Sequence, residues 1–69
     1  MTIASDLLVW KEQNQLLIIK LIAPKNNRKI LIGRIIQYDA EKCNILIYLD
    51  DDKTLSSVSI YEIDQIKPA

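Results

Sequence analysis

The 69-residue chain contains no histidine, one cysteine and one glycine. Without histidine it lacks the side chain that most often serves as a general base near neutral pH. A single cysteine cannot form an internal disulfide, which suits a reducing compartment. A single glycine, Gly33, cannot build a glycine-rich phosphate loop. These absences argue against an enzyme and favour a protein that works by binding.

The chain also lacks net charge, because nine Lys and Arg residues balance nine Asp and Glu residues. A protein that grips DNA or RNA through phosphates is usually basic, so neutrality argues against non-specific nucleic-acid binding. Residues 1–10 lack the basic start and cleavage site of a signal peptide. The longest apolar run, residues 16–23, is broken by Lys20 and is too short to cross a bilayer. We therefore expect a cytoplasmic protein without a membrane partner.

What the chain has in abundance is aliphatic side chains, since 49% of its residues are hydrophobic. Its length predicts one domain, residues 1–69. A domain this small buries only about 60% of its unfolded surface. The surplus apolar surface favours a homo-oligomer or docking on a protein partner.

Residues 3–14 are predicted to form a short helix. Ile3, Leu7 and Trp10 share one face at spacings of three and four. This face is expected to cover one end of a sheet. Leu8 and Val9 fall off that face, which indicates a second contact.

From Leu16 onward β-branched residues dominate, and five strands are predicted. The predicted strands are residues 16–23, 30–38, 44–50, 55–61 and 63–66. Glu62 is expected in a tight turn, and Gly33, in mid-strand, is expected to mark a bulge or bend. The fold class is mainly β: a short N-terminal helix, then a five-stranded, strongly bent antiparallel small barrel.

No catalytic, metal or cofactor site is predicted. Cys43 has no histidine partner and is expected to be a small buried thiol. Asp50, Asp51 and Asp52 are adjacent carboxylates, but the positions where a calcium loop needs Gly and Glu hold Leu55 and Tyr61. A solvated hairpin turn is the expected role of these three aspartates.

Two groups of residues are compatible with binding. Lys25, Arg28 and Lys29 form a basic loop, which is either a soluble turn or a patch for phosphate or an acidic partner. Three tyrosines, at positions 38, 48 and 61, either pad a half-buried sheet or stack on bases.

The segment around the glycine resembles the first motif of the Sm and Sm-like proteins. That motif reads Gly-x-Leu-x-x-aromatic-Asp, then a short gap, then Asn-apolar-x-apolar. GRIIQYD (residues 33–39) matches its first half, and CNILI (residues 43–47) matches its second half with one extra residue in the turn. YEIDQIKP (residues 61–68) is similar to the last strands of the bacterial relative Hfq. The resemblance covers residues 6–68.

This resemblance implies an Sm-like (SH3-like) small barrel that assembles into a ring and binds single-stranded RNA through the turn from Asp39 to Asn44. Asn44 would contact a base, Asp39 would brace it, and Tyr38 would belong to the same candidate RNA site. The chain lacks the second Sm motif, a basic residue followed by Gly, because Ser59–Glu62 occupies its place. The Lys-His pair typical of Hfq is also missing.

The chain also resembles the C-terminal half of bacterial YolD-like proteins. Glu12–Gln15, residues 33–39 and Ile60–Ile66 fit their outline. Those proteins are often carried by mobile elements beside translesion polymerase genes. This resemblance implies a bacterial or phage accessory that binds protein.

The polar residues of the turn also have a purely structural interpretation, since Asp39 and Asn44 can hydrogen-bond the turn's own backbone. We rank a non-enzymatic module that self-assembles or docks on a protein partner first. A ring that binds single-stranded RNA through Tyr38, Asp39 and Asn44 is the alternative.

Overall fold

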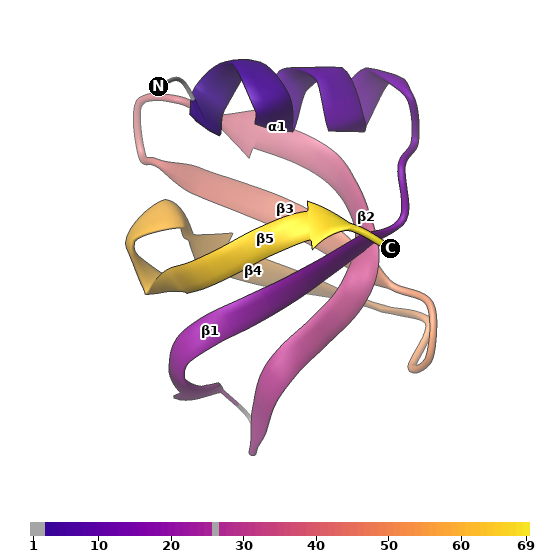
Figure 1. Cartoon of the computed structure of the whole chain (residues 1–69), viewed down its shortest axis with the longest axis vertical. Coiled ribbons are helices and arrows are strands. Elements are labelled where there is room, and N and C mark those ends of the chain that lie inside the picture. Colours follow the sequence, from indigo (N-terminus) through magenta and orange to yellow (C-terminus); the bar gives the residue numbers. More distant parts are fainter. Residues whose placement is uncertain (1–2, 26) are drawn as a thin grey trace.

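The computed structural model describes residues 3–25 and 27–69. One short helix lies across one end of a bent antiparallel sheet (Figure 1). The elements in chain order are α1 (Ile3–Glu12), β1 (Leu17–Lys25), β2 (Arg28–Asp39), β3 (Asn44–Leu49), β4 (Thr54–Ser59), the 3₁₀ turn η1 (Ile60–Glu62) and β5 (Ile63–Pro68). The mainly β class predicted from the sequence is confirmed.

The strands form one sheet in the order β4-β3-β2-β1-β5, and every neighbouring pair is antiparallel. The sheet is not closed into a barrel. Strands β4 and β5 are its two edges and are not paired with each other within the described residues. The short link through η1 bends the chain from one edge of the sheet to the other (Figure 1). The predicted barrel is therefore, in this chain, a strongly bent open sheet.

The core lies inside this bend and beneath α1. Its buried side chains are Leu7 from the helix and, from the strands, Leu17, Ile19, Leu21, Leu31, Ile35, Ile45, Ile47, Leu49 and Val58. Strand β3 shows the underlying pattern most clearly, because buried and half-buried residues alternate along all of its length. This is the two-residue period of a strand with one face in the core.

Helix α1 docks through Leu7, which is fully buried, and Trp10, which packs on the core from a half-buried position. It ends at Glu12, two residues before the predicted end. Asn14 follows in the left-handed conformation, with φ of 53°, and such a residue commonly terminates a helix. The side chain of Arg34 in β2 donates to the Asn14 carbonyl (3.2 Å), which fixes the helix end to the sheet.

Gly33 allows close approach of two strands. A Cβ atom at this position would lie 2.2 Å from the carbonyl oxygen of Tyr48 in β3. The shift in register between β2 and β3 falls between Ile35 and Gln37 instead of at the glycine, so Ile36 is the extra residue. The predicted bulge therefore lies three residues beyond Gly33, while the glycine itself is required by the Tyr48 backbone.

Two turns differ from the prediction. The loop expected at residues 24–29 is a tight hairpin, since β1 continues through Pro24 to Lys25 and β2 begins at Arg28. The fourth strand ends at Ser59, where η1 begins. Ser59 and Glu62 form a reciprocal capping box there, with the Ser59 hydroxyl accepting from the Tyr61 amide and the Glu62 carboxylate accepting from the Ser59 amide. Among the described residues, no helix has the length and apolar character that crossing a membrane requires.

Candidate binding site

The turn between β2 and β3 is organised by Asp39. One oxygen of its carboxylate accepts hydrogen bonds from the backbone amides of Glu41 (3.1 Å) and Lys42 (3.2 Å). This is the arrangement by which an aspartate stabilises its own turn. The hydrogen bonds expected between Asp39 and its own turn are therefore present, and this oxygen already accepts two of them.

Asn44 begins β3 directly opposite Asp39. Its half-buried side chain lines a shallow depression of about 230 Å³ on the outer side of the sheet. Gln37, Lys42, Leu46 and Ser57 form other parts of the lining. Pockets for drug-sized ligands usually span about 300–1,000 Å³, so this depression suits a small group and not an enclosed substrate.

Tyr38 does not share this depression. It is opposite Ile45, and its ring packs against the core. Because neighbouring strand residues point to opposite faces, Tyr38 and Asp39 cannot present one surface. The three predicted RNA-site residues are therefore divided between the two faces of the sheet.

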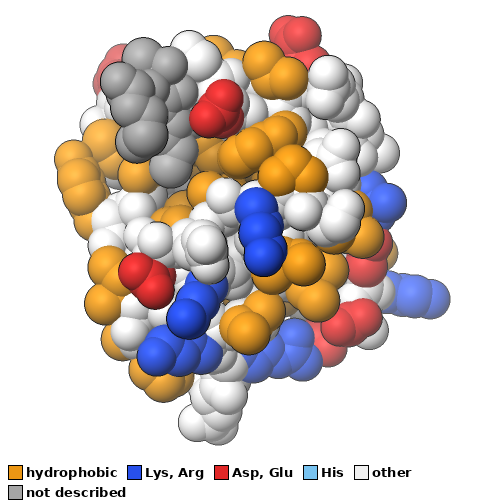
Figure 2. Space-filling model, viewed as in Figure 1, with side chains coloured by type: hydrophobic (Ala, Val, Ile, Leu, Met, Phe, Trp, Pro, Cys, Tyr) orange, Lys and Arg blue, Asp and Glu red, His pale blue; other side chains and the backbone are white. Residues whose placement is uncertain are grey.

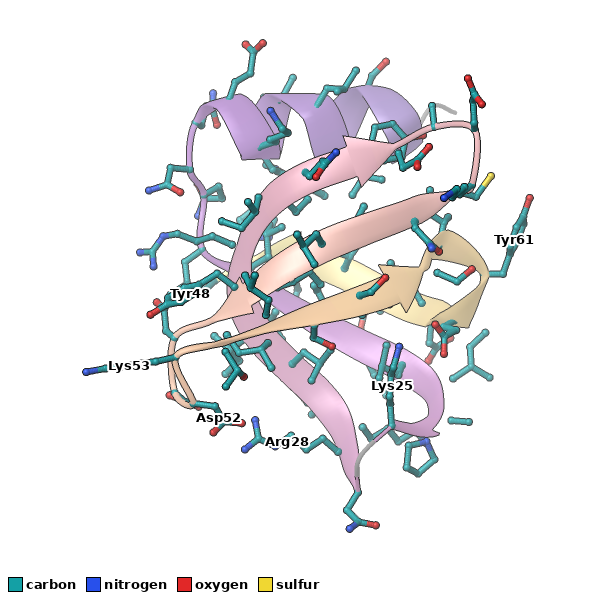
Figure 3. The ribbon with its side chains drawn as sticks, turned by 180° about the vertical axis from the view of Figure 1, so that it is seen from behind. Lys25, Arg28, Tyr48, Asp52, Lys53 and Tyr61 are labelled. Carbon is teal, nitrogen blue, oxygen red and sulfur yellow. The ribbon has the colours of Figure 1, made fainter. Side chains whose placement is uncertain are left out.

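An exposed aromatic side chain, Tyr61 of η1, contacts this turn and is 77% exposed. Figure 3 shows it projecting away from the ribbon. Its hydroxyl lies 3.6 Å from the Cys43 sulfur, and the Ile60 amide donates to the Cys43 carbonyl (2.8 Å). The hydrogen bond with Cys43 raises the pKa of Tyr61 above its ordinary value. The β2–β3 turn and η1 therefore touch, a contact that spacing along the chain did not reveal.

Cys43 differs from its prediction. It is half-buried, and its backbone is left-handed, with φ of 53°. A residue in this conformation closes the turn, and its thiol reaches the surface beside Tyr61. It is thus a turn residue instead of a small core side chain.

Two of the three residues of the basic loop make ion pairs. Arg28 binds Asp52 at 2.7 Å, which raises the pKa of the Arg28 guanidinium. Lys25 lies 3.7 Å from Glu62 and also donates to the carbonyl of Ser57. Figure 3 shows Arg28 and Asp52 pointing toward each other, with Lys25 under β4. Only Lys29 of the three remains outside the ion pairs found among residues 3–25 and 27–69.

Two of the three aspartates of the β3–β4 turn form ion pairs with arginines. Asp50 binds Arg34 at 2.5 Å, and Asp52 binds Arg28. Within the part of the chain that the structure describes, no group of three acidic or thiol side chains is arranged to hold a metal ion.

Strand β4 is one of the two edges of the sheet. In an antiparallel pair, hydrogen-bonded and non-hydrogen-bonded positions alternate. The bond from the Ile60 amide to the Cys43 carbonyl therefore directs the backbone groups of Leu55, Ser57 and Ser59 away from β3. Two of these outward groups have partners: the Ser57 carbonyl binds Lys25, and the Ser59 amide binds Glu62 at 2.8 Å.

The other edge of the sheet, β5, also has backbone groups that point away from its neighbouring strand. The Ala69 amide donates to the Leu16 carbonyl at 2.9 Å, one step beyond the register that pairs Leu17 with Pro68. The alternation then directs the backbone of Ile66 away from β1. Pro68 occupies the next outward position, where a proline loses no ladder hydrogen bond.

A scan against protein-family models found no match for this chain, and searches of curated proteins and of solved structures found none either.

Proposed function

We propose that this protein is a non-enzymatic binding module that self-assembles by pairing β4 of one copy with β5 of the next. The observation that carries the proposal is the sheet order, which leaves two different six-residue strands as edges at the two ends of one bent sheet. Unpaired strand edges are templates for further strands.

Pairing of unlike edges is a head-to-tail contact, which repeats from copy to copy. Such contacts close into a ring when the rotation between copies allows it. The bend of the sheet favours closure into a ring. In a flat sheet the two edges face in opposite directions, whereas in this bent sheet the β4 and β5 edges do not (Figure 1). The element order, one helix and five bent antiparallel strands, supports the further proposal that the fold is related to the Sm-like small barrels.

The experiment is a measurement of mass in solution at micromolar concentration. We expect a species several times heavier than the 8.0 kDa chain. Ser57→Pro removes an outward amide without touching the ladder with β3, so it should leave the circular-dichroism spectrum intact and reduce the mass toward that of a monomer. Ser57→Lys, which places a charge at the edge, is the second variant in case proline perturbs the strand. A wild-type monomer, or folded variants with wild-type mass, would contradict the proposal.

The alternative function is binding of single-stranded RNA. The contact between Cys43 and Tyr61 favours it, because it places an exposed aromatic ring next to the turn that holds Asn44. Base stacking on aromatic side chains contributes about 1–3 kcal/mol per base. Against it are the neutral chain and the engagement of Asp39, Lys25 and Arg28 in contacts of their own.

Labelled oligo(U) and oligo(A) separate the two functions. Submicromolar binding at physiological salt that Asn44→Ala and Tyr61→Ala both weaken would favour RNA binding over self-assembly as the function. We expect weak or absent binding, unchanged by either substitution.

A further inference from the structure

Helix α1 carries a second apolar surface on the side away from the core. Leu8 and Val9 are each 49% exposed, whereas Leu7 is fully buried. Ser5 and Glu12 share the outward side with them, since residues three and four apart are neighbours on a helix. The outward side of α1 is therefore an apolar pair followed by a carboxylate.

The outer face of β1 and β2 is a second exposed apolar surface. Ile18 lies opposite Ile32, and Lys20 lies opposite Ile30. Ile30 is 55% exposed and Ile32 is 39% exposed. We call this surface, made by Ile18, Lys20, Ile30 and Ile32, the outer sheet patch.

The two surfaces carry opposite charges. Lys20 is within the outer sheet patch, and Lys67 of β5 is opposite Ile18 at its border. Figure 2 shows the face over β1 and β5, where orange apolar side chains are broken by blue lysine and arginine side chains. Glu12 is exposed on α1, and neither it nor the two lysines belongs to an ion pair found among the described residues.

A second copy fits the outer sheet patch better than a membrane or a nucleic acid does. Two lysines attract an anionic lipid surface only weakly, at about 1 kcal/mol each. The aliphatic side chains of the patch offer no ring on which a base stacks. In contrast, the chain itself supplies an apolar segment of the opposite charge on α1.

We infer that α1 of one copy docks on the outer sheet patch of another, with Leu8 and Val9 on Ile30 and Ile32 and with Glu12 beside Lys20. The contact joins unlike surfaces and is therefore head-to-tail. This contact uses neither of the strand edges proposed for ring assembly. It therefore links copies in a different direction and depends on different residues.

Charge reversal tests the inference, with sedimentation velocity in a Ser57→Pro background so that edge pairing does not mask the result. Lys20→Glu alone and Glu12→Lys alone should each weaken association at least about tenfold, because each places like charges together. An equimolar mixture of the two variants should restore association, because the reversed helix of one meets the reversed patch of the other. Leu8→Ala should also weaken it.

Lys53→Glu is the matched control, since Lys53 is an exposed lysine in the β3–β4 turn and belongs to neither α1 nor the outer sheet patch (Figure 3). It should associate like the parent. The inference is overturned if the single reversals associate like the parent, or if mixing restores nothing. It is also overturned if Lys20→Glu leaves association unchanged but abolishes binding to phosphatidylglycerol vesicles, which would assign the patch to a membrane.

Discussion

Lys25 and Glu62 lie 3.7 Å apart, and each binds one outward backbone group of β4. Lys25 reaches the Ser57 carbonyl across 32 positions of sequence, whereas Glu62 binds the Ser59 amide through a local cap. The ion pair thus covers the end of the β4 edge that is nearest η1. A strand that pairs with this end must displace Lys25, because the Ser57 carbonyl would become its acceptor.

Replacing Lys25 with methionine should therefore strengthen edge assembly. The substitution keeps an apolar stem and removes a donor that competes with the incoming strand. One such hydrogen bond is worth about 1 kcal/mol, so the dissociation constant should fall about fivefold. Lys29→Met, in the same hairpin, is the control and should change little. Weaker assembly of Lys25→Met in concentration-dependent sedimentation would show that Lys25 supports the interface instead of restricting it.

Any side chain at position 33 should destabilise the fold. A Cβ atom there would lie 2.2 Å from the Tyr48 carbonyl oxygen and 2.9 Å from a methyl group of Ile47, so β2 and β3 must separate. We expect Gly33→Ala to lower the free energy of unfolding by about 1–3 kcal/mol. The measurement is a urea titration, with Lys29→Ala at an exposed site of the same strand as the control. Equal midpoints for Gly33→Ala and wild type would refute the close approach.

Alanine substitutions of Asp39 and Asn44 should differ in their effect on the free energy of unfolding. Asp39→Ala removes the acceptor of two turn amides and should cost about 1–2 kcal/mol. Asn44→Ala should cost less, because the described residues give its side chain no hydrogen bond. The two chemical-denaturation midpoints decide this. A larger loss for Asn44→Ala would mean that this amide, and not the carboxylate, organises the turn.

Tyr61 should titrate at higher pH than a free tyrosine. Its pKa is raised by Cys43, so Cys43→Ala should move its tyrosinate absorbance to lower pH, with Tyr61→Phe identifying its share of the signal. Because the folded-state pKa lies above the unfolded value near 10, the associated stability is present below about pH 10 and is lost as the pH rises through the folded-state pKa. An unshifted titration in Cys43→Ala would show that the thiol and the phenol do not interact in solution.

Local pattern was enough to predict much of this fold. The existence of β3 follows from the apolar and β-branched residues at positions 44–49, and the docking face of α1 follows from the spacing of Leu7 and Trp10. The role of Asp39 was also predictable, because its partners lie two and three residues along the chain. In each case the deciding interaction is short in sequence.

The features that the sequence concealed depend on distant residues. The reason for Gly33 is a carbonyl fifteen positions away, at Tyr48. The division of Tyr38 from Asp39 and Asn44 follows from which face of β2 meets the core. The hydrogen bond from Lys25 to the Ser57 carbonyl of β4 and the contact of Tyr61 with Cys43 both require the bend of the whole sheet.

The most direct test of edge assembly is residue-resolved amide hydrogen exchange at two protein concentrations, one below and one above the association midpoint. If β4 pairs with β5 of the next copy, the outward amides of Leu55, Ser57 and Ile66 exchange more slowly at the higher concentration, while amides in β2 exchange equally at both. This pairing would be contradicted if the mass rises with concentration but these three amides exchange at the same rate, or if the protein stays at 8.0 kDa throughout.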